Sequence, residues 1–364
     1  MRIPQTMAAA LLIGNGGLEK LDYRTDVAVP QPAAGEVLIE VKASAVNNTD
    51  INTRIGWYSK QINVATEEGG AAGFDNTDNE DASWSGTPLG FPRIQGADAC
   101  GYIVAVGEGV DQSRIGQRVL VRNMLRTGVD YRSYECWTFG SECDGGFAQF
   151  ATAPARETYA VNSDWSDEQL AAVPCAYSTA ELMLDRANVI DGERVLITGA
   201  SGGVGLAAVQ LAKRRGAHVI ALSSPTKAEA LKAQGADEVL DRNSVLPSAL
   251  TSKVHVVLDV VCGEGVNERL SILHKGGRYA IAGAIGGPMT QVDLRTIYLN
   301  DLRILGCTFQ DDHIFENLIG YIERDEIKPH VSKVYPLAHI AQAQEDFLSK
   351  KHMGKLVLVP PSVN

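Results

Sequence analysis

One stretch of the sequence constrains the fold more than any other: residues 193–216, which read ERVLITGASGGVGLAAVQLAKRRG. An apolar, β-branched run leads directly into a glycine-rich turn, and a helical pattern of apolar residues follows and ends on Gly216. A strand, a turn and a helix in this order form the first part of a strand–helix–strand unit, whose strands lie parallel in one sheet. The sequence therefore predicts an α/β domain built around this stretch.

The strand–helix alternation extends on both sides of this stretch. Residues 167–189 show one long helical pattern, and nearly all-apolar strands are predicted at 217–224, 254–261 and 277–284. Strands with so few polar positions are buried on both faces, as they are in a doubly wound parallel sheet. We therefore expect a doubly wound parallel-sheet domain over residues 166–312.

The first part of the chain has a different rhythm, in which Gly, Pro and Asp separate short strands. These strands are predicted at 36–48, 100–107, 117–121 and 146–154. Such spacing is typical of a compact β-barrel, which we place at residues 1–165. The last segment, 313–364, combines a helical pattern with the strand GKLVLVP, and we expect it to return to the barrel domain.

Residues 59–92 do not fit the barrel pattern. This insertion is rich in Gly, Asn and Asp and carries two aromatic residues, Phe74 and Trp84. A long segment of this kind inside a compact domain is either a functional flap or disordered. As a flap near the mouth of a cleft, it would bring the two aromatic side chains to an apolar substrate pocket.

Composition excludes several classes of partner. The chain of 364 residues has a formal net charge of −11, whereas nucleic acids and anionic membranes are bound by basic faces. The six cysteines are scattered without a CxxC pair, which favours reduced thiols and a cytoplasmic protein. The N-terminal apolar run, residues 7–14, is too short for a membrane span or a signal peptide, so we expect a first β-strand there.

The glycine-rich turn follows the pattern A-x-G-x-x-G between a strand and a helix, which is the context of a dinucleotide site. In such a site the second position lets the backbone approach a pyrophosphate, and the third lets the helix pack closely on the strand. The N–H groups at the start of the helix face the phosphates, with the helix dipole behind them. The alternative is a tight turn that binds nothing. The predicted cofactor-binding residues in the turn are Ala200, Ser201, Gly202, Gly203, Val204 and Gly205.

The next strand bears on the choice between NAD and NADP. An NAD site places an acidic residue just after this strand, but the chain has Ser223 and Ser224 there, followed by Lys227. Hydroxyl groups and an ammonium suit a 2′-phosphate, and Arg242 adds a second cation, so we expect NADPH. Alternatively, the two cations are solvated surface charges. Thr179, Val261 and Gly283 complete the predicted cofactor-binding set.

Together these motifs resemble the medium-chain dehydrogenase/reductase superfamily. The matching segments occur in the superfamily's order along nearly all of the chain outside the insertion; they are PQPAAGEVLIEVKASAVNNTD, IQGADACGYIVAVGEGV, GQRVLV, GGFAQFATAP, ERVLITGASGGVG, LRILGCTF and GKLVLVP. The resemblance implies a GroES-like barrel that carries the catalytic residues, a Rossmann domain, and a homodimer formed through the Rossmann domain.

The superfamily includes zinc-dependent alcohol dehydrogenases and zinc-free quinone and enone reductases, and the chain resembles the zinc-free branch. Zinc members carry Cys where this chain has Asn47, and Gly-His-Glu where it has Gly96-Ala97-Asp98. No histidine precedes His218, and the run of four cysteines that holds a structural zinc is missing. A catalytic zinc needs three N, S or O ligands, so we expect no metal.

The resemblance also implies a set of catalytic residues in the segment AVNNTDINTRIGWY: Asn47, Asp50, Arg54 and Tyr58. It implies that Asn47 lies near the nicotinamide and that Tyr58 orients the substrate carbonyl or donates a proton. Asp50 and Arg54 are four residues apart, so we expect an ion pair on one helical face. That pair could equally serve structure alone, and the tyrosine could be a partly buried aromatic. Quinone reductases often have a second tyrosine where this chain has Asn52, which puts quinones in doubt.

A site without zinc favours conjugated acceptors. When hydride reaches the conjugated carbon of an enone, enal or quinone, the charge moves to the oxygen as an enolate, which neutral hydrogen-bond donors can stabilise. We therefore expect zinc-independent reduction of a small conjugated carbonyl by NADPH. The alternatives are an alcohol dehydrogenase or ketone reductase of the same superfamily, and a protein that binds NADPH without turnover.

Overall fold

The computed structural model describes residues 3–74 and 79–363. The chain divides into two compact units. Unit 1 comprises Met1–Ile62, Glu68–Cys175 and Asp311–Asn364, and unit 2 comprises Asn63–Glu67 and Ala176–Gln310. These bounds differ from the predicted 1–165 and 166–312 because unit 1 reaches ten residues further along the chain, and because five residues of the insertion cluster with unit 2.

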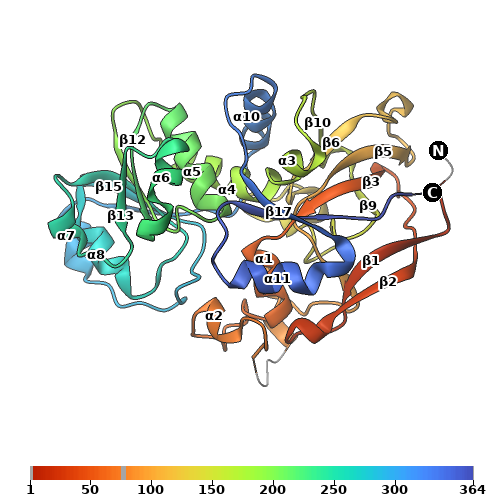
Figure 1. The fold of residues 1–364 in the computed structure, drawn as a ribbon, viewed down its shortest axis with the longest axis horizontal. Coiled ribbons are helices and arrows are strands. Elements are labelled where there is room, and N and C mark those ends of the chain that lie inside the picture. The colour runs from red at the N-terminus through yellow and green to blue at the C-terminus, as the bar shows by residue number, and fades with distance from the viewer. Residues whose placement is uncertain (1–2, 75–78, 364) are drawn as a thin grey trace. The chain divides into compact units, whose positions relative to one another are not determined.

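Unit 1 contains the barrel (Figure 1). Its strands are β1 (Thr6–Leu12), β2 (Leu21–Ala28), β3 (Glu36–Ala45), β4 (Arg93–Ile94), β5 (Cys100–Val106), β6 (Arg118–Val121), β7 (Met124–Leu125), β8 (Trp137–Thr138), β9 (Phe150–Pro154), β10 (Thr158–Ala160), β17 (Val331–Pro336) and β18 (Lys355–Val359). Its helices are α1 (Asn48–Ile55), α3 (Asp167–Ala171), α10 (Asp312–Glu323) and α11 (Ile340–Leu348). The main sheet has the order β10-β6-β5-β3-β18-β17, and β9 pairs with β3.

Strand β3 is central to this unit because successive side chains of a strand point to opposite faces. Val37, Ile39 and Val41 are buried in one apolar cluster, whereas Leu38 is buried in another. The C-terminal strand β18 pairs antiparallel with the end of β3, with Val357 opposite Ala45. The chain therefore returns from residue 311 onward to complete the sheet that carries the start of α1.

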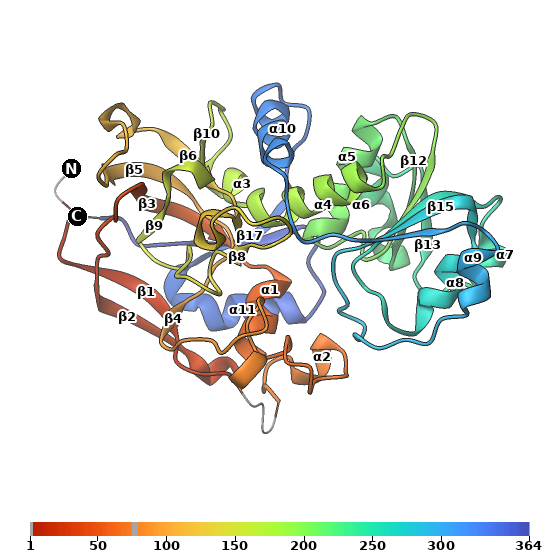
Figure 2. The ribbon, with the colours of Figure 1, turned by 180° about the vertical axis from the view of Figure 1, so that it is seen from behind.

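Unit 2 contains the parallel sheet, and the predicted α/β fold class is confirmed. Its strands are β11 (Arg194–Ile197), β12 (His218–Ser223), β13 (Glu238–Asp241), β14 (Val254–Asp259), β15 (Leu273–Ile281) and β16 (Arg303–Gly306), in the order β13-β12-β11-β14-β15-β16. Figures 1 and 2 show α5 (Gly203–Arg214) and α6 (Ala228–Ala233) on one face, and α7 (Leu246–Ala249), α8 (Val266–Ser271) and α9 (Leu294–Tyr298) on the other. The strand order reverses direction between β11 and β14, where doubly wound folds bind their ligands.

The single helix predicted for residues 167–189 is wrong, because the structure has two. Ser166 caps α3 in a capping box with Gln169, and α4 begins separately at Pro174 and runs to Arg186. Proline lacks the backbone N–H that a continuous helix would need at that point, whereas it is well suited to the first turn of a new helix.

The insertion at 59–92 carries short helical turns in its described parts. Helix α2 covers Thr66–Gly69, and the Thr66 N–H donates to the carbonyl of Ile285 within unit 2 over 3.2 Å. Phe74 is partly buried against the barrel core, and its role in a substrate pocket stays a prediction. Residues 75–78 of the insertion lie outside the described residues. Among residues 3–74 and 79–363, no helix is long and apolar enough to cross a membrane.

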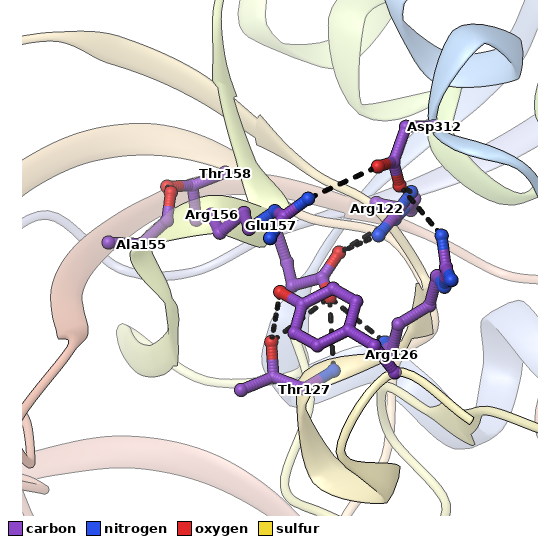
Figure 3. A network of polar contacts seen from close by, with 9 residues as sticks. Arg122, Arg126, Thr127, Ala155, Arg156, Glu157, Thr158 and Asp312 are labelled. Carbon is purple, nitrogen blue, oxygen red and sulfur yellow. Dashed lines mark hydrogen bonds and ion pairs between the residues drawn. The ribbon is translucent and has the colours of Figure 1, made fainter.

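A buried network of charges ties the C-terminal return to the barrel (Figure 3). Arg122 is completely buried and donates from Nε to Glu157 over 2.7 Å and from Nη1 to Asp312 over 2.7 Å. Asp312 also accepts from Arg126 and Arg156, over 3.2 and 3.4 Å. The first residue of α10 is thereby held by three guanidinium groups from the barrel.

Candidate active site

The glycine-rich turn has the geometry that the sequence predicts. A Cβ on Gly205 would lie 2.2 Å from the Gly199 carbonyl oxygen, so α5 can pack this closely on β11 only with glycine there. A Cβ on Gly202 would meet nothing of the protein closer than 3.4 Å. Packing therefore explains the glycine at 205, whereas the exposed glycine at 202 borders open space of the kind a pyrophosphate would use.

The start of α5 supplies donors for an anion. Gly202 is the N-cap with extended backbone, and Gly203 and Val204 are the first helical residues. Their backbone N–H groups have no partner within the helix, and the positive end of the helix dipole lies at the same point. The turn therefore fits the phosphates of a dinucleotide.

Asp259 fixes the loops around this turn, and the sequence analysis missed it. Its buried carboxylate accepts from the Thr198 hydroxyl over 2.7 Å and from the N–H groups of Val261 and Cys262 over 2.8 and 2.9 Å. Arg269 pairs with the other carboxylate oxygen over 2.8 Å. A charged residue at the end of the apolar run VHVVLD was the signal that could have identified it.

Ser223, Ser224, Lys227 and Arg242 gather at the end of β12. Lys227 Nζ reaches back to the Ser201 hydroxyl of the glycine-rich turn over 3.4 Å, and Arg242 donates its N–H to the Ser223 carbonyl over 3.0 Å. The Ser223 hydroxyl is buried without a hydrogen-bond partner among the described residues. Burial, and then the charge of Arg242, lower the pKa of Lys227. Two cations that repel each other beside an unsatisfied hydroxyl fit a phosphate group.

The remaining predicted cofactor residues come from three elements. Val261 follows β14 and Gly283 follows β15, so both lie at the carboxyl edge of the sheet, where the glycine-rich turn also lies. Val261 also contacts the turn, since its Cγ2 would lie 3.4 Å from a Cβ at Gly199. Thr179 comes from α4, and its place in the site rests on the resemblance alone.

In unit 1, Asn47 and Asp50 form the start of α1. The Asn47 N–H donates to Asp50 Oδ2 over 2.8 Å, as in a capping box, and the Ala97 N–H donates to Asp50 Oδ1 over 3.2 Å. Burial, opposed by these bonds and reinforced by the Asp98 carboxylate, raises the pKa of Asp50 to about 7. The site thus holds a carboxyl group that changes its charge near neutral pH.

The predicted Asp50–Arg54 ion pair is wrong. Arg54 is fully buried and donates from Nη1 to the Gly16 carbonyl over 2.7 Å and from Nη2 to the Gly70 carbonyl over 2.7 Å. Its Nε donates to Gln344 Oε1 over 2.8 Å. Burial lowers the pKa of Arg54 to about 10. The four-residue spacing allowed a pair, but the carboxylate turns back to cap the helix, so Arg54 braces the loops instead.

The side chain of Asn47 is bound into a buried cluster that the sequence analysis missed. Asn47 Nδ2 donates to Asp98 Oδ2 over 2.7 Å and to the Ala45 carbonyl over 3.1 Å, and Lys355 Nζ donates to Asn47 Oδ1. Lys355 also donates to Asp98 Oδ2 over 3.1 Å, and the Cys175 N–H donates to Asp98 Oδ1 over 2.6 Å. Both amide hydrogens of Asn47 are thus used within the protein. The only signals were Asp98 and Lys355 in otherwise apolar segments.

Tyr58 follows α1 beyond its C-cap, Gly56. Its hydroxyl donates to Thr49 Oγ1 over 3.0 Å, and its ring meets that of Trp84 edge to face, with centroids 4.9 Å apart. Burial raises the pKa of Tyr58, so the phenol keeps its proton over the physiological pH range. Trp84 of the insertion therefore packs against Tyr58, and its predicted role in a substrate pocket stays a prediction.

The residues present do not fit a catalytic zinc. Asn47 and Ala97 stand where the zinc branch has a thiolate and an imidazole, and the Lys355 ammonium is bonded to Asn47 and Asp98. In the part of the chain that the structure describes, no three His, Cys, Asp or Glu side chains lie together as a metal site would require.

Comparisons with known proteins match most of the chain. Residues 33–163 match the family model of the alcohol dehydrogenase GroES-like domain, and residues 203–324 match that of the zinc-binding dehydrogenases. Quinone oxidoreductase from Rattus norvegicus is 29% identical over 97% of this chain and 98% of its own length. Acryloyl-coenzyme A reductase from Metallosphaera sedula is 28% identical over 92% of this chain and 95% of its own length.

A solved structure is more similar still. It comes from Sinorhizobium meliloti 1021 and is provisionally described as an alcohol dehydrogenase. Its sequence is 44% identical to this chain, the match covers 99% of this chain and 98% of the other, and the TM-score is 0.88. Similarity at this level over both full lengths extends to the barrel and to the parallel sheet alike.

Proposed function

This chain belongs to the medium-chain dehydrogenase/reductase superfamily, whose members use nicotinamide cofactors, and we propose that it reduces a conjugated carbonyl with NADPH and without zinc. One observation carries the proposal. The ammonium of Lys355 donates to the Asn47 amide and the Asp98 carboxylate, at the position where a zinc dehydrogenase would hold its metal. The acceptor must then be one whose developing charge needs no Lewis acid, as with an enone, an enal or a quinone.

The residues of unit 1 divide into two roles. Bound NADPH would supply the hydride to the conjugated carbon. Tyr58 keeps its proton, and we assign to it the hydrogen bond that orients the carbonyl and stabilises the enolate oxygen. Its hydroxyl would turn from Thr49 Oγ1 to the substrate to form this bond. Water then delivers the proton to the carbon that lies between the carbonyl group and the carbon that received the hydride. Asn47 and Asp50, whose bonds are directed inward, act as positioning residues for α1 rather than as donors to the substrate.

The deciding experiment compares acceptors of equal length. We expect NADPH oxidation with 2-enals, enones or quinones, little with saturated ketones, and no loss of rate after EDTA treatment. Tyr58→Phe should lower kcat roughly a hundredfold, the usual cost of removing one oxyanion donor. Tyr134→Phe is the matched control, because Tyr134 lies in the same unit and is 79% exposed.

A ketone reductase is the second candidate, since the structure from Sinorhizobium meliloti is provisionally described as an alcohol dehydrogenase. Faster turnover of saturated ketones would favour it over the conjugated carbonyl. Activity lost to EDTA and restored by zinc would refute the metal-free site. Tight binding of NADPH without its oxidation by any acceptor would indicate a protein that binds NADPH without turnover.

We propose NADPH over NADH because Ser223, Ser224, Lys227 and Arg242 gather at the end of β12. Ser224→Asp should shift the ratio of kcat/KM for NADPH to that for NADH by roughly tenfold or more, since like charges in contact cost over about 1.4 kcal/mol. Ser248→Asp adds the same charge on α7 as a control. An unchanged ratio in Ser224→Asp would refute the phosphate site.

We also propose a homodimer formed through unit 2. Strand β16 lies at the edge of the sheet, and the segment before it carries apolar side chains exposed to solvent: Leu294 at 69%, Tyr298 at 64% and Leu299 at 60%. An unpaired strand edge beside apolar surface favours pairing with a second copy. Sedimentation velocity should give twice the mass of the chain.

We further propose a reducing compartment such as the cytoplasm. All six cysteines are free, and burial raises the pKa of Cys136 and Cys307 to about 11. Buried thiols of this kind are unreactive. Thiol titration of the freshly purified protein, unfolded without reductant, should find six free thiols.

A further inference from the structure

A cavity lies in unit 2, away from the predicted cofactor site. Its volume is about 320 Å³, which is at the lower end of the range for small-molecule pockets. Arg278 and Arg303 contribute to its lining from the first paired positions of β15 and β16, near the amino edge of the sheet. The glycine-rich turn lies at the carboxyl edge, so the two sites are separate.

Positive charge dominates this cavity. Three arginines line it, Arg186, Arg278 and Arg303, against a single carboxylate, Glu193. Arg278 is neutralised, because its Nη1 and Nη2 donate to the two Glu193 oxygens over 2.8 and 2.6 Å. Arg186 donates to the carbonyls of Gly306 and Phe309, which carry no charge. The positive charges of Arg186 and Arg303 thus remain uncompensated in the cavity, although the net charge of the chain is −11.

The register of the sheet sets two of the three arginines side by side. Arg278 lies directly opposite Arg303 in the parallel pair β15–β16, and neighbours in register project to the same face. Like charges at such positions destabilise a sheet. Arg303 is exposed and forms no ion pair within residues 3–74 and 79–363. Glu193 compensates Arg278, so Arg303 is the member of this pair whose charge is left for a bound anion.

We propose that this cavity binds a phosphate dianion, either free or as the phosphoryl group of a small monoester. Guanidinium groups bind phosphate through paired N–H donors, and two uncompensated charges match a dianion. Because one water occupies about 30 Å³ in the liquid, the cavity has room for a phosphate and a short organic group. The site is separate from the NADPH and carbonyl sites, so it holds whether or not the proposed reduction is correct.

Isothermal titration of inorganic phosphate into the full chain tests this proposal, with chloride at matched ionic strength as the reference. We expect saturable binding that Arg303→Gln weakens roughly tenfold, the effect of losing one charge-assisted bond. Arg295→Gln is the control, because it removes the same charge from an exposed position of unit 2, paired only with Asp293. Glycerol 3-phosphate separates the two sources, since tighter binding than phosphate identifies a monoester.

Three outcomes would overturn the proposal. Phosphate could act no differently from chloride. Binding could persist in Arg303→Gln and disappear in Lys227→Gln, which would assign it to the cofactor site. Arg303→Gln could instead change the sedimentation mass without affecting phosphate, which would show that a carboxylate from a second copy fills the cavity. Arg303 is exposed, so its variant should fold like the parent, and circular dichroism checks this.

Discussion

Unit 1 contains two clusters of charge. In the balanced cluster, Arg122, Arg126, Arg156, Glu157 and Asp312, every carboxylate has a guanidinium partner. In the unbalanced cluster, Asp50, Asp98 and Lys355, the carboxylates outnumber the cation. Around Glu157 and Asp312, every carboxylate oxygen that is used meets a guanidinium or a backbone donor, and the hydrogen bond from Arg122 lowers the pKa of Asp312. Around Asp50, two carboxylates share one ammonium, and burial raises the pKa of Asp50 to about 7. The pKa values of two aspartates in the same unit thus shift in opposite directions, because burial dominates at Asp50 and the bond from a guanidinium dominates at Asp312.

The balanced cluster braces the scaffold, whereas the unbalanced one lies among the proposed catalytic residues. Groups poised to titrate near neutral pH are a feature of functional sites, while fully paired networks give rigidity. Proteins usually depart from rules such as the pairing of every buried charge at the positions where function requires it. The three predictions below test whether this division between the clusters is real.

The largest effect is expected in the balanced cluster. Glu157→Gln should destabilise the chain by about 3 to 5 kcal/mol, because it removes the fully buried carboxylate of Arg122 and leaves only the partly exposed Asp312 to it. Urea unfolding followed by circular dichroism measures the change. Glu135→Gln is the control, since the exposed Arg132–Glu135 pair should contribute at most about 1 kcal/mol. Equal losses in the two variants would show that the network does not brace the barrel.

The second effect is a pH dependence from Asp50. Its pKa is raised from 3.8 to about 7, so the folded state holds a proton that the unfolded state has released. The stabilisation is complete below about pH 4 and is lost as pH rises to about 7, by at most about 4 kcal/mol. Asp50→Asn keeps the cap without titrating. The parent should therefore lose stability relative to this variant across that window, as urea unfolding at several pH values measures; a constant difference would contradict it.

The smallest effect concerns Lys355, whose charge lowers the pKa of Asp50 against the effect of burial. Lys355→Met should move the midpoint of the Asp50 transition to higher pH, whereas Lys355→Arg should leave it close to the parent value. The carboxyl stretching band in infrared spectra, assigned by its loss in Asp50→Asn, follows this titration. A midpoint unchanged in the methionine variant would mean that the two groups are electrostatically independent.

Short-range patterns predicted much of this molecule. The strand, turn and helix at 193–216, the parallel sheet and the helical spacing of Asp50 and Arg54 all depend on residues close in sequence. The ion pair between those two residues failed because a helix cap competes for the same carboxylate. Even within a short helix, the spacing of Asp50 and Arg54 did not determine which groups bind the Asp50 carboxylate.

The rest depends on contacts that no local pattern contains. Lys355 meets Asp98 across 257 positions, and Arg122 meets Asp312 across 190. Both contacts exist because the chain returns to the barrel after the parallel sheet, and the pairing of β18 with β3 accompanies the contact of Lys355 with Asn47 and Asp98. The sequence signals were single charged residues in apolar segments, which identify a buried polar group without naming its partner.

The place of β18 in the sheet also sets the order in which the protein is assembled. A ribosome releases residues 176–310 before Lys355, so the parallel sheet can form on the nascent chain while the barrel still lacks a central strand. Until β18 arrives, Asn47 and Asp98 face each other without their ammonium, and the edge of β3 is open. Synthesis that stalls between the two would leave a complete parallel sheet attached to an unfinished barrel.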